Sequence, residues 1–124
     1  MKIIHTDNAP KAVGPYSQAI EADKMLFLSG QIAINPKVGD ITAKDIAAQT
    51  EQCCKNIEAV LKEAGAELKN VVKTTCFLAD IKDFAAFNEV YGKYFAHKPA
   101  RSCVAVKDLP KGALCEIEVT AVKN

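Results

Sequence analysis

The sequence predicts an α+β fold in which two helices lie on one face of a six-stranded mixed sheet. Residues 43–64 and 84–95 repeat apolar side chains at intervals of three and four, which is the spacing of one helix face. The other segments are shorter, rich in Val, Ile and Thr, and separated by Gly, Pro, Asn and Asp, as is typical of strands and turns.

Length and composition predict one domain spanning residues 1–124. With 49% hydrophobic and 25% charged residues, the chain can bury a core without the help of metal ions or disulfides. The net charge of +1 comes from evenly spread residues, so we expect no nucleic-acid or anionic-membrane partner. No apolar stretch reaches membrane-spanning length and no signal-peptide core is present, which predicts a cytoplasmic protein.

Cysteine and histidine usage predicts neither a metal site nor a disulfide framework. The chain has no Cys-x-x-Cys pair, and its two histidines are far apart in sequence. Five cysteines, an odd number, are expected to be free thiols in a reducing compartment.

The first third of the chain predicts a stiff loop followed by a hairpin. Residues 6–16 lack periodicity and contain two prolines, which fix the backbone. Residues 17–21 and 25–34 are predicted strands around a turn at 22–24. Residues 35–40, Asn-Pro-Lys-Val-Gly-Asp, have turn chemistry and end the second strand.

An amphipathic helix is predicted over residues 43–64. Thr42 is its expected N-cap, and Gly65 can take a positive φ just after the last turn. A strand rich in Val and Thr follows at residues 70–79. The apolar or small positions that define the buried helix face are Ile46, Thr50, Cys53, Ile57, Val60, Leu61 and Ala64.

A second helix, capped by Asp80 or Asp83, carries a stripe of Phe and Tyr that we assign to the core, and it ends before Pro99. Two last strands, residues 100–106 and 113–122, flank a turn-rich connector. The expected order of elements is β-β-β-α-β-α-β-β, which includes one more strand before the first helix than the two whose bounds are predicted above.

Several predicted strands carry apolar side chains on both faces of the sheet. Leu26, Phe27 and Leu28 are consecutive, as are Val71 and Val72, so alternate members must point in opposite directions. Two helices cover only one face. We therefore expect a homo-oligomer in which copies pack their uncovered sheet faces together.

Arg101 is the only arginine among sixteen basic residues, and it lies inside a predicted strand. Lysine suffices for a solvated charge, whereas the planar guanidinium can make two parallel hydrogen bonds to the carboxylate of a small substrate. A cross-strand salt bridge is the alternative. If the last two strands pair as a hairpin, alternation places Arg101 and Cys103 on the same face as Glu116 and Glu118.

Energies do not decide between these two functions for the arginine. An exposed arginine–glutamate pair contributes about 0.2–1 kcal/mol, whereas hydrogen bonds to a charged group in a dry cleft contribute roughly 1.5–3 kcal/mol. Which range applies depends on how far Arg101 is buried. The salt bridge and the substrate anchor therefore both remain open at this point.

Glu116 is the candidate acid/base, because a carboxylate beside an arginine can orient water or carry a proton; a solvated strand face is the alternative. Cys103 is predicted to be an inert buried thiol rather than a nucleophile, since no histidine is placed beside it. Further residues that could line a cleft, each with a purely structural explanation as well, are Tyr16, Ser29, Gly30 and Asn88.

These residues belong to motifs spread along the whole chain: Gly14-Pro15-Tyr16-Ser17, Leu28-Ser29-Gly30-Gln31, Val72-Lys73-Thr74-Thr75, Asn88, Pro99-Ala100-Arg101-Ser102-Cys103-Val104 and Ile117-Glu118-Val119-Thr120-Ala121. Together they resemble the reactive intermediate deaminase family (RidA, YjgF-type).

The resemblance implies a chorismate-mutase-like fold and a homotrimeric barrel with clefts between subunits, working without a cofactor or metal. It implies hydrolysis of 2-aminoacrylate and 2-aminocrotonate, as their imines 2-iminopropanoate and 2-iminobutanoate, to 2-oxo acids and ammonia. Arg101 would grip the substrate carboxylate and Glu116 would orient the attacking water. Lining residues, some from the neighbouring subunit, would be Tyr16, Ser29, Gly30, Asn88 and, through its backbone, Cys103.

A non-catalytic regulatory module that binds small 2-oxo acids at the same cleft is the main alternative, because the arginine serves it equally well. RNA cleavage has also been attached to this family. The near-neutral charge and single arginine argue against it.

Overall fold

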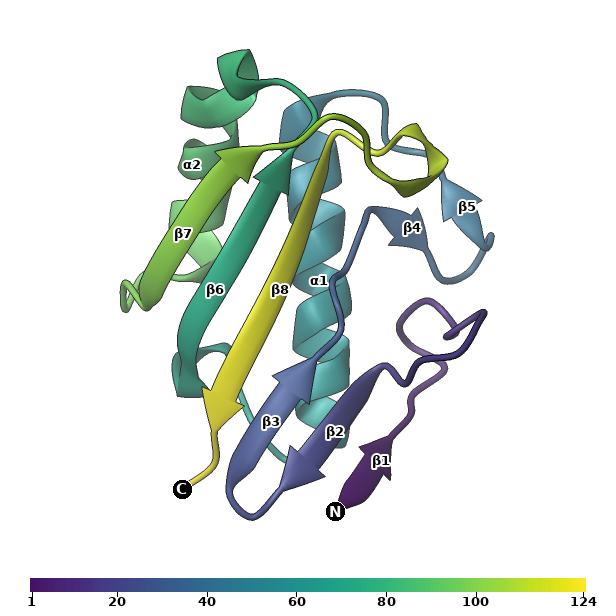
Figure 1. The fold of residues 1–124 in the computed structure, drawn as a ribbon, viewed down its shortest axis with the longest axis vertical. Helices are drawn as coiled ribbons and strands as arrows, with labels where there is room; N and C mark the ends of the chain where they lie inside the picture. The colour runs from purple at the N-terminus through teal and green to yellow at the C-terminus, as the bar shows by residue number, and fades with distance from the viewer.

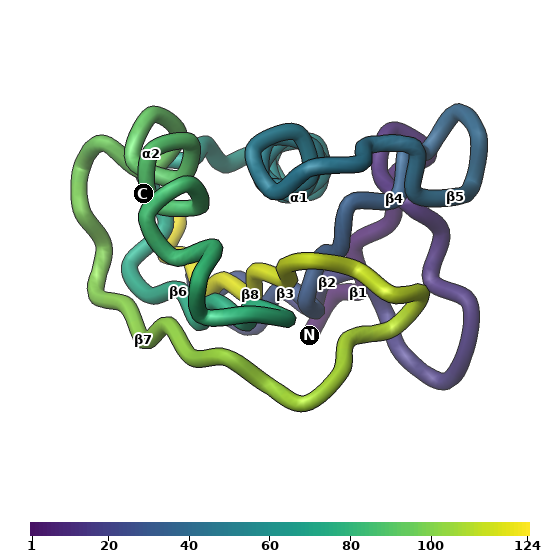
Figure 2. The backbone as a smooth tube through the Cα atoms, turned by 90° about the horizontal axis from the view of Figure 1, so that it is seen from above, coloured from purple at the N-terminus to yellow at the C-terminus, as the bar shows by residue number.

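A computed structural model describes residues 1–124 and shows a six-stranded sheet with two helices on one face (Figure 1), as the sequence predicts. Figure 2 shows the two layers in cross-section, with both helices on the same side of the sheet. The strands, in their order across the sheet, are β1 (Lys2–Ile4), β2 (Ala19–Ala22), β3 (Met25–Leu28), β8 (Cys115–Val122), β6 (Val71–Leu78) and β7 (Ala100–Ala105). The helices are α1 (Ile46–Glu63) and α2 (Phe84–Tyr94).

The sheet is mixed because one pair of strands is parallel. β6 and β7 run in the same direction, and α2 supplies the crossover that such a pair requires. All other neighbours in the sheet are antiparallel. Neither helix is long and apolar enough to cross a membrane.

The predicted hairpin between the last two strands is wrong. β6 lies between β7 and β8, so residues 106–114 cross the end of β6 rather than making a tight turn (Figure 1). Two strand spacings amount to about 10 Å, a distance that a connection of this length spans easily. A turn-rich connector between two strands therefore does not by itself identify them as neighbours.

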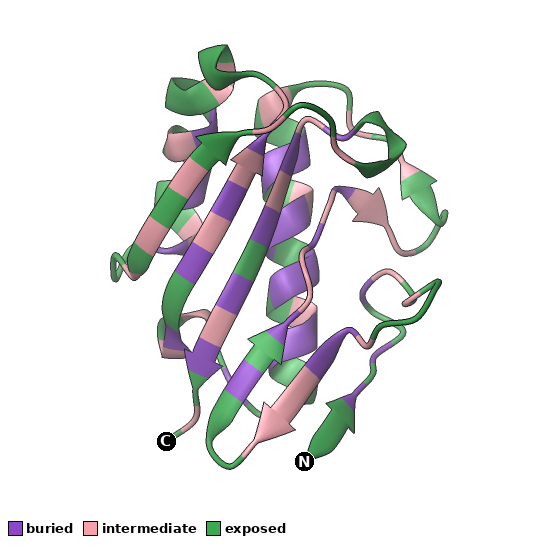
Figure 3. Ribbon diagram, in the orientation of Figure 1, coloured by how far each residue is buried: buried purple, intermediate pink, exposed green.

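The core lies between the sheet and the helices. Figure 3 shows buried positions alternating with more exposed ones along β6 and β8, as expected when one face of a sheet is covered. Ile57 and Leu61 of α1 and Ile117 and Val119 of β8 are all at most 1% exposed. The other sheet face is uncovered, and its Phe27 side chain is 45% exposed. The prediction that strands present apolar side chains to both faces is thus confirmed.

Several element boundaries differ from those predicted. α1 is capped by Asp45, whose Oδ1 accepts a hydrogen bond from the backbone N–H of Ala48 (2.8 Å), and not by Thr42. Gly65 takes a φ of +79°, as predicted. Asp80 caps a 3₁₀ turn that precedes α2. Asp83, the other predicted cap, occupies the N-cap position of α2 but makes no side-chain capping hydrogen bond.

The second predicted strand, residues 25–34, is shorter than expected. β3 ends at Leu28, Gln31 still pairs with Ile117 of β8 through an isolated bridge, and the chain then leaves the sheet to form a separate two-stranded hairpin. That hairpin consists of β4 (Ile34–Asn35) and β5 (Asp40–Ile41), and its turn is the segment for which turn chemistry was predicted.

Candidate functional site

Arg101 projects from the edge strand β7 toward α2. Its Nη1 donates a hydrogen bond of 2.7 Å to Oδ1 of Asn88. Its guanidinium carbon lies 4.9 Å from the ring centroid of Tyr91 and 5.6 Å from that of Phe84. Arg101 forms no ion pair with any carboxylate, which excludes the cross-strand salt bridge. The guanidinium is thus held by neutral groups, and its positive charge is left without a partner.

The sequence of α2 explains this arrangement. Phe84, Asn88 and Tyr91 are spaced four and three residues apart, so they share one face of the helix. That face looks toward β7, where Arg101 is located. We name Arg101, Asn88, Tyr91 and Phe84 the arginine group.

Cys103 lies on the same face of β7 as Arg101, because two residues separate them on one strand. Its thiol is half-buried, and burial raises its pKa against the opposing effect of the Arg101 charge. Neither histidine is near: His5 is paired with Asp7, and His97 contacts the carbonyl of Val71. The thiol therefore has no activating base, and Cys103 remains predicted as an inert cysteine.

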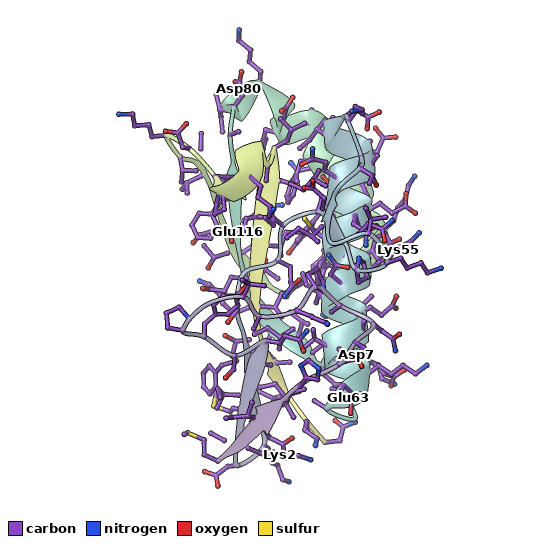
Figure 4. All side chains as sticks on the ribbon, turned by 90° about the vertical axis from the view of Figure 1, so that its right-hand side faces the viewer. Lys2, Asp7, Lys55, Glu63, Asp80 and Glu116 are labelled. Carbon is purple, nitrogen blue, oxygen red and sulfur yellow. The ribbon has the colours of Figure 1, made fainter.

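Glu116 lies in a different place, at a cavity of about 840 Å³. Figure 4 labels Glu116 on the side of β8 that faces away from α1, whereas Lys55 points outward from α1. The polar cavity-lining residues of interest are Tyr16, Gln18, Ser29, Gly30, Gln31, Lys37, Lys111 and Glu116. We name Glu116, Gly30, Ser29 and Tyr16 the glutamate group.

Gly30 sets the position of the glutamate side chain. A Cβ atom on Gly30 would lie 2.7 Å from Oε2 and 2.9 Å from Cδ of Glu116, so only glycine leaves room for the carboxylate there. Two backbone hydrogen bonds between Gln31 and Ile117, of 2.8 and 3.0 Å, fix the segments side by side. Because Gln31 and Ile117 directly follow Gly30 and Glu116, their pairing also brings Gly30 close to Glu116.

Ser29 ties the N-terminal loop to the sheet. Its hydroxyl donates a hydrogen bond of 2.6 Å to the carbonyl of Ser17, and its backbone N–H donates to the carbonyl of Gln18 (3.0 Å). Tyr16 follows Gly14 in the same loop and is half exposed at the cavity. The loop predicted to be stiff is therefore fastened at the point where it lines the cavity.

The environment of Glu116 favours its protonated form more than water does. Burial raises the pKa of the Glu116 carboxyl, and the negative charge of Glu118 raises it further. A raised pKa brings the carboxyl closer to neutral pH, where it can both accept and donate a proton.

The arginine and glutamate groups do not meet within one chain. Arg101 pairs with Thr74 of β6, whereas Glu116 pairs with Phe77, and three residues along a strand reverse the direction of the side chain. Arg101 therefore faces the helices and Glu116 faces away from them. The prediction that they share a face is wrong, because it assumed the hairpin that β6 interrupts.

Tyr91 and Phe84 were predicted as core residues and their contact with the arginine was missed. Tyr91 is buried and its hydroxyl forms a hydrogen bond of 2.7 Å with that of Thr74. The sequence did contain an indication of this contact. Phe84 and Tyr91 are spaced four and three residues from Asn88, which was already a candidate cleft-lining residue. No three His, Cys, Asp or Glu side chains come together as metal ligands.

Comparison with known proteins places this chain and its fold in a family. Residues 6–123 match the family described as Endoribonuclease L-PSP. A RutC family protein of Pyrococcus horikoshii is 53% identical over 99% of this chain and 98% of its own length. The chain belongs to this family.

Solved structures support the same assignment. YyfA of Yersinia pestis, described as a protein of the conserved Rid family, is 51% identical with a TM-score of 0.95 and covers 98% of both chains. TdcF of E. coli, solved with bound serine, is 41% identical with a TM-score of 0.95 over the full length of both chains. The resemblance to RidA and YjgF-type proteins stated from the motifs is therefore confirmed.

Proposed function

We propose that the protein hydrolyses small enamine and imine acids, such as 2-iminobutanoate and 2-iminopropanoate, to 2-oxo acids and ammonia. The reaction takes place in clefts between copies of a homotrimer, where the arginine group of one copy faces the glutamate group of its neighbour. It uses the side chains of the protein alone, without a cofactor or metal.

The observation that carries this proposal is the unpaired charge of Arg101. A guanidinium held by Asn88 and two aromatic rings keeps N–H groups free for a bidentate contact with a carboxylate. Small 2-imino acids carry a carboxylate beside the reacting carbon. The serine bound to E. coli TdcF is a ligand of this size that has a carboxylate beside a nitrogen-bearing carbon, which supports the substrate class.

Glu116 supplies the proton transfers. As a carboxylate it takes a proton from water as the water oxygen bonds to the imine carbon, and it passes that proton to the nitrogen, which receives the electron pair of the C=N π bond. In the resulting carbinolamine the Glu116 carboxylate takes the hydroxyl proton and passes it to the nitrogen as the C–N bond breaks, so ammonia leaves and the carbon keeps its oxygen as a carbonyl. A raised pKa suits both steps, because acid/base catalysis is most efficient when the pKa approaches the working pH.

The uncovered sheet face supports assembly from several copies. Met25, Phe27, Val104 and Val122 are apolar side chains between 38% and 46% exposed. They lie on strands β3, β7 and β8. Burying them against other copies stabilises the oligomer. A closed ring of three also lets each copy give its arginine group to one cleft and its glutamate group to another.

A coupled assay tests this function. A threonine or serine dehydratase generates the imine, semicarbazide competes for it, and 2-oxo acid formation is followed with and without the protein. We expect the protein to increase 2-oxo acid formation and to lower semicarbazone yield. No acceleration over the uncatalysed rate would contradict the proposal.

Glu116→Ala separates turnover from binding in the same assay. If the protein is an enzyme, this variant loses ammonia release but still binds 2-oxobutanoate, because Arg101 is intact. Equal ammonia release by Glu116→Ala and the wild type would instead favour the regulatory module that only binds 2-oxo acids.

A further inference from the structure

Arg101 needs external support to act as an anchor. β7 is the last strand of the sheet, so Arg101 has a strand neighbour on one side only. An arginine side chain has about 2 kcal/mol of rotamer entropy to lose when it becomes fixed. Its one hydrogen bond, to Asn88, holds a single nitrogen and leaves the plane of the guanidinium free to turn about that contact.

The ring of Tyr91 lies under the guanidinium at 4.9 Å, nearer than the ring of Phe84 at 5.6 Å. Both distances fall within the range of a cation–π contact, about 6 Å. Phe84 is 38% exposed, whereas Tyr91 is only 7% exposed and so is more closely packed. Tyr91 is therefore the fixed member of the pair.

Three contacts fix the plane of the Tyr91 ring. It stacks on Phe87 with centroids 5.6 Å apart and on Phe95 with centroids 4.6 Å apart. Its hydroxyl forms the 2.7 Å hydrogen bond with Thr74, a residue that is 1% exposed. Burial raises the pKa of the Tyr91 hydroxyl, which keeps it protonated and able to donate.

Thr74 is also the register partner of Arg101 across the β6–β7 pair. The two residues thus start from neighbouring positions on the same sheet face. The Thr74 side chain holds the Tyr91 ring through its hydroxyl, and the Arg101 side chain lies over that ring. The position of the guanidinium is consequently tied to the sheet through Tyr91, and not only through its own strand.

We propose that Tyr91, held by Thr74, is a positioning residue that fixes the plane of Arg101 for bidentate capture of the substrate carboxylate. This inference rests on the proposed function. Tyr91 does not touch the reacting atoms. Its loss should therefore weaken carboxylate binding and leave the chemical step nearly unchanged.

The first test observes Arg101 directly, without substrate. Because the chain has one arginine, its Nε–H gives a single arginine signal in a ¹⁵N NMR spectrum of the intact protein. We expect that signal to be shifted from the value of free arginine in the wild type, and to be shifted less in Tyr91→Phe, which keeps the ring but loses the hydroxyl that Thr74 holds. In Tyr91→Leu it should move toward the free value. A wild-type signal at the free value, or identical signals in the wild type and Tyr91→Leu, would overturn the inference.

The second test measures binding and turnover. Tyr91→Leu should raise the Kd for 2-oxobutanoate and the KM for the imine about 3- to 30-fold, the range given by cation–π energies. Its kcat should stay within about threefold of the wild type. Tyr91→Phe, which keeps the ring but loses its hydrogen bond to Thr74, should have an affinity between those of the wild type and Tyr91→Leu. Unchanged affinity in folded Tyr91→Leu would overturn the inference.

Tyr94→Leu is the matched control, since Tyr94 lies on the same helix and its hydroxyl contacts Glu51 rather than the arginine group. We expect its affinity to equal that of the wild type. If Tyr91→Leu fails to fold, Thr74→Val tests the same link, and an arginine signal and Kd equal to those of the wild type would overturn the inference. If the wild type neither binds 2-oxobutanoate nor turns over the imine, the proposed function is refuted. The NMR experiment needs no substrate, so it still tests the contact between Tyr91 and Arg101 in that case.

Discussion

Arg101 and Glu116 project from opposite faces of one sheet. Their partners on β6, Thr74 and Phe77, are three residues apart, which reverses the direction of the side chain. The arginine is held against α2 and the glutamate lies at the cavity beside Gly30. A single site that uses both must therefore combine groups from two copies.

Replacing Arg101 with lysine keeps the charge but removes the planar fork. We expect Arg101→Lys to fold normally and to lose at least about tenfold in affinity for 2-oxobutanoate, because hydrogen bonds to charged groups contribute roughly 1.5–3 kcal/mol. Calorimetric titration gives the affinity, and thermal unfolding reports on folding. Full activity in Arg101→Lys would contradict the proposal that Arg101 binds the carboxylate through two parallel hydrogen bonds.

Adding one methyl group at Gly30 should displace the Glu116 carboxylate, since the new Cβ would lie 2.7 Å from Oε2. The far end of a glutamate can move, so we expect Gly30→Ala to lose at least about tenfold in kcat with little change in Tm. Gly92→Ala is the control, because a Cβ there meets nothing within 4 Å. It should keep full activity and gain up to about 1 kcal/mol of stability from helix propensity. Wild-type kcat in Gly30→Ala would refute this role for the glutamate position.

The pH dependence of turnover should report on the environment of Glu116. A base must be ionised, so kcat/KM should fall as the pH falls through the Glu116 pKa, which burial and Glu118 raise above the ordinary value. In Glu118→Gln one of these two causes is removed, and the acidic limb of the profile should move to lower pH. A limb that does not move in that variant would show that Glu116 is not the titrating group.

Stability should follow the same shift with a defined sign. Because the folded-state pKa of Glu116 is raised, its contribution to stability is fully present below the unfolded pKa and is lost as the pH rises through the folded pKa. Glu116→Gln cannot ionise. Relative to the wild type, the variant should therefore be more stable at pH 7 than at pH 4. Denaturant titrations of both proteins at both pH values measure this difference in the free energy of unfolding. An equal difference at the two pH values would contradict the raised pKa.

Much of the fold could be predicted from periodicity. The helical repeats of Ile57 and Leu61 located α1, and consecutive apolar residues such as Leu26 and Phe27 predicted a sheet with two apolar faces. Strand order could not be predicted in the same way. Pairing of β7 with β6 depends on how α2 packs against the sheet, and no local pattern in the sequence records that contact.

The candidate site, too, could be predicted from the sequence only in part. Rarity identified Arg101, and alternation in a hairpin that does not form drew attention to Glu116 beside it. Gly30 was a possible cleft-lining residue, and the family resemblance then assigned roles to Glu116 and Gly30. Tyr91 was hidden, because a tyrosine in an aromatic helical stripe has the pattern of a core residue whether or not a guanidinium lies over its ring. Only the register that places Thr74 opposite Arg101 reveals the connection.

Mixing two impaired variants, assayed at substrate concentrations below the wild-type KM, tests most directly whether the site is shared between copies. Arg101→Lys and Glu116→Gln are co-expressed in equal amounts and purified as mixed oligomers, whose composition native mass spectrometry verifies. In randomly mixed rings about a quarter of the clefts should join an intact Arg101 to an intact Glu116, so we predict about a quarter of wild-type activity. Activity no higher than that of either variant alone would place both residues in a site within one chain and contradict the account.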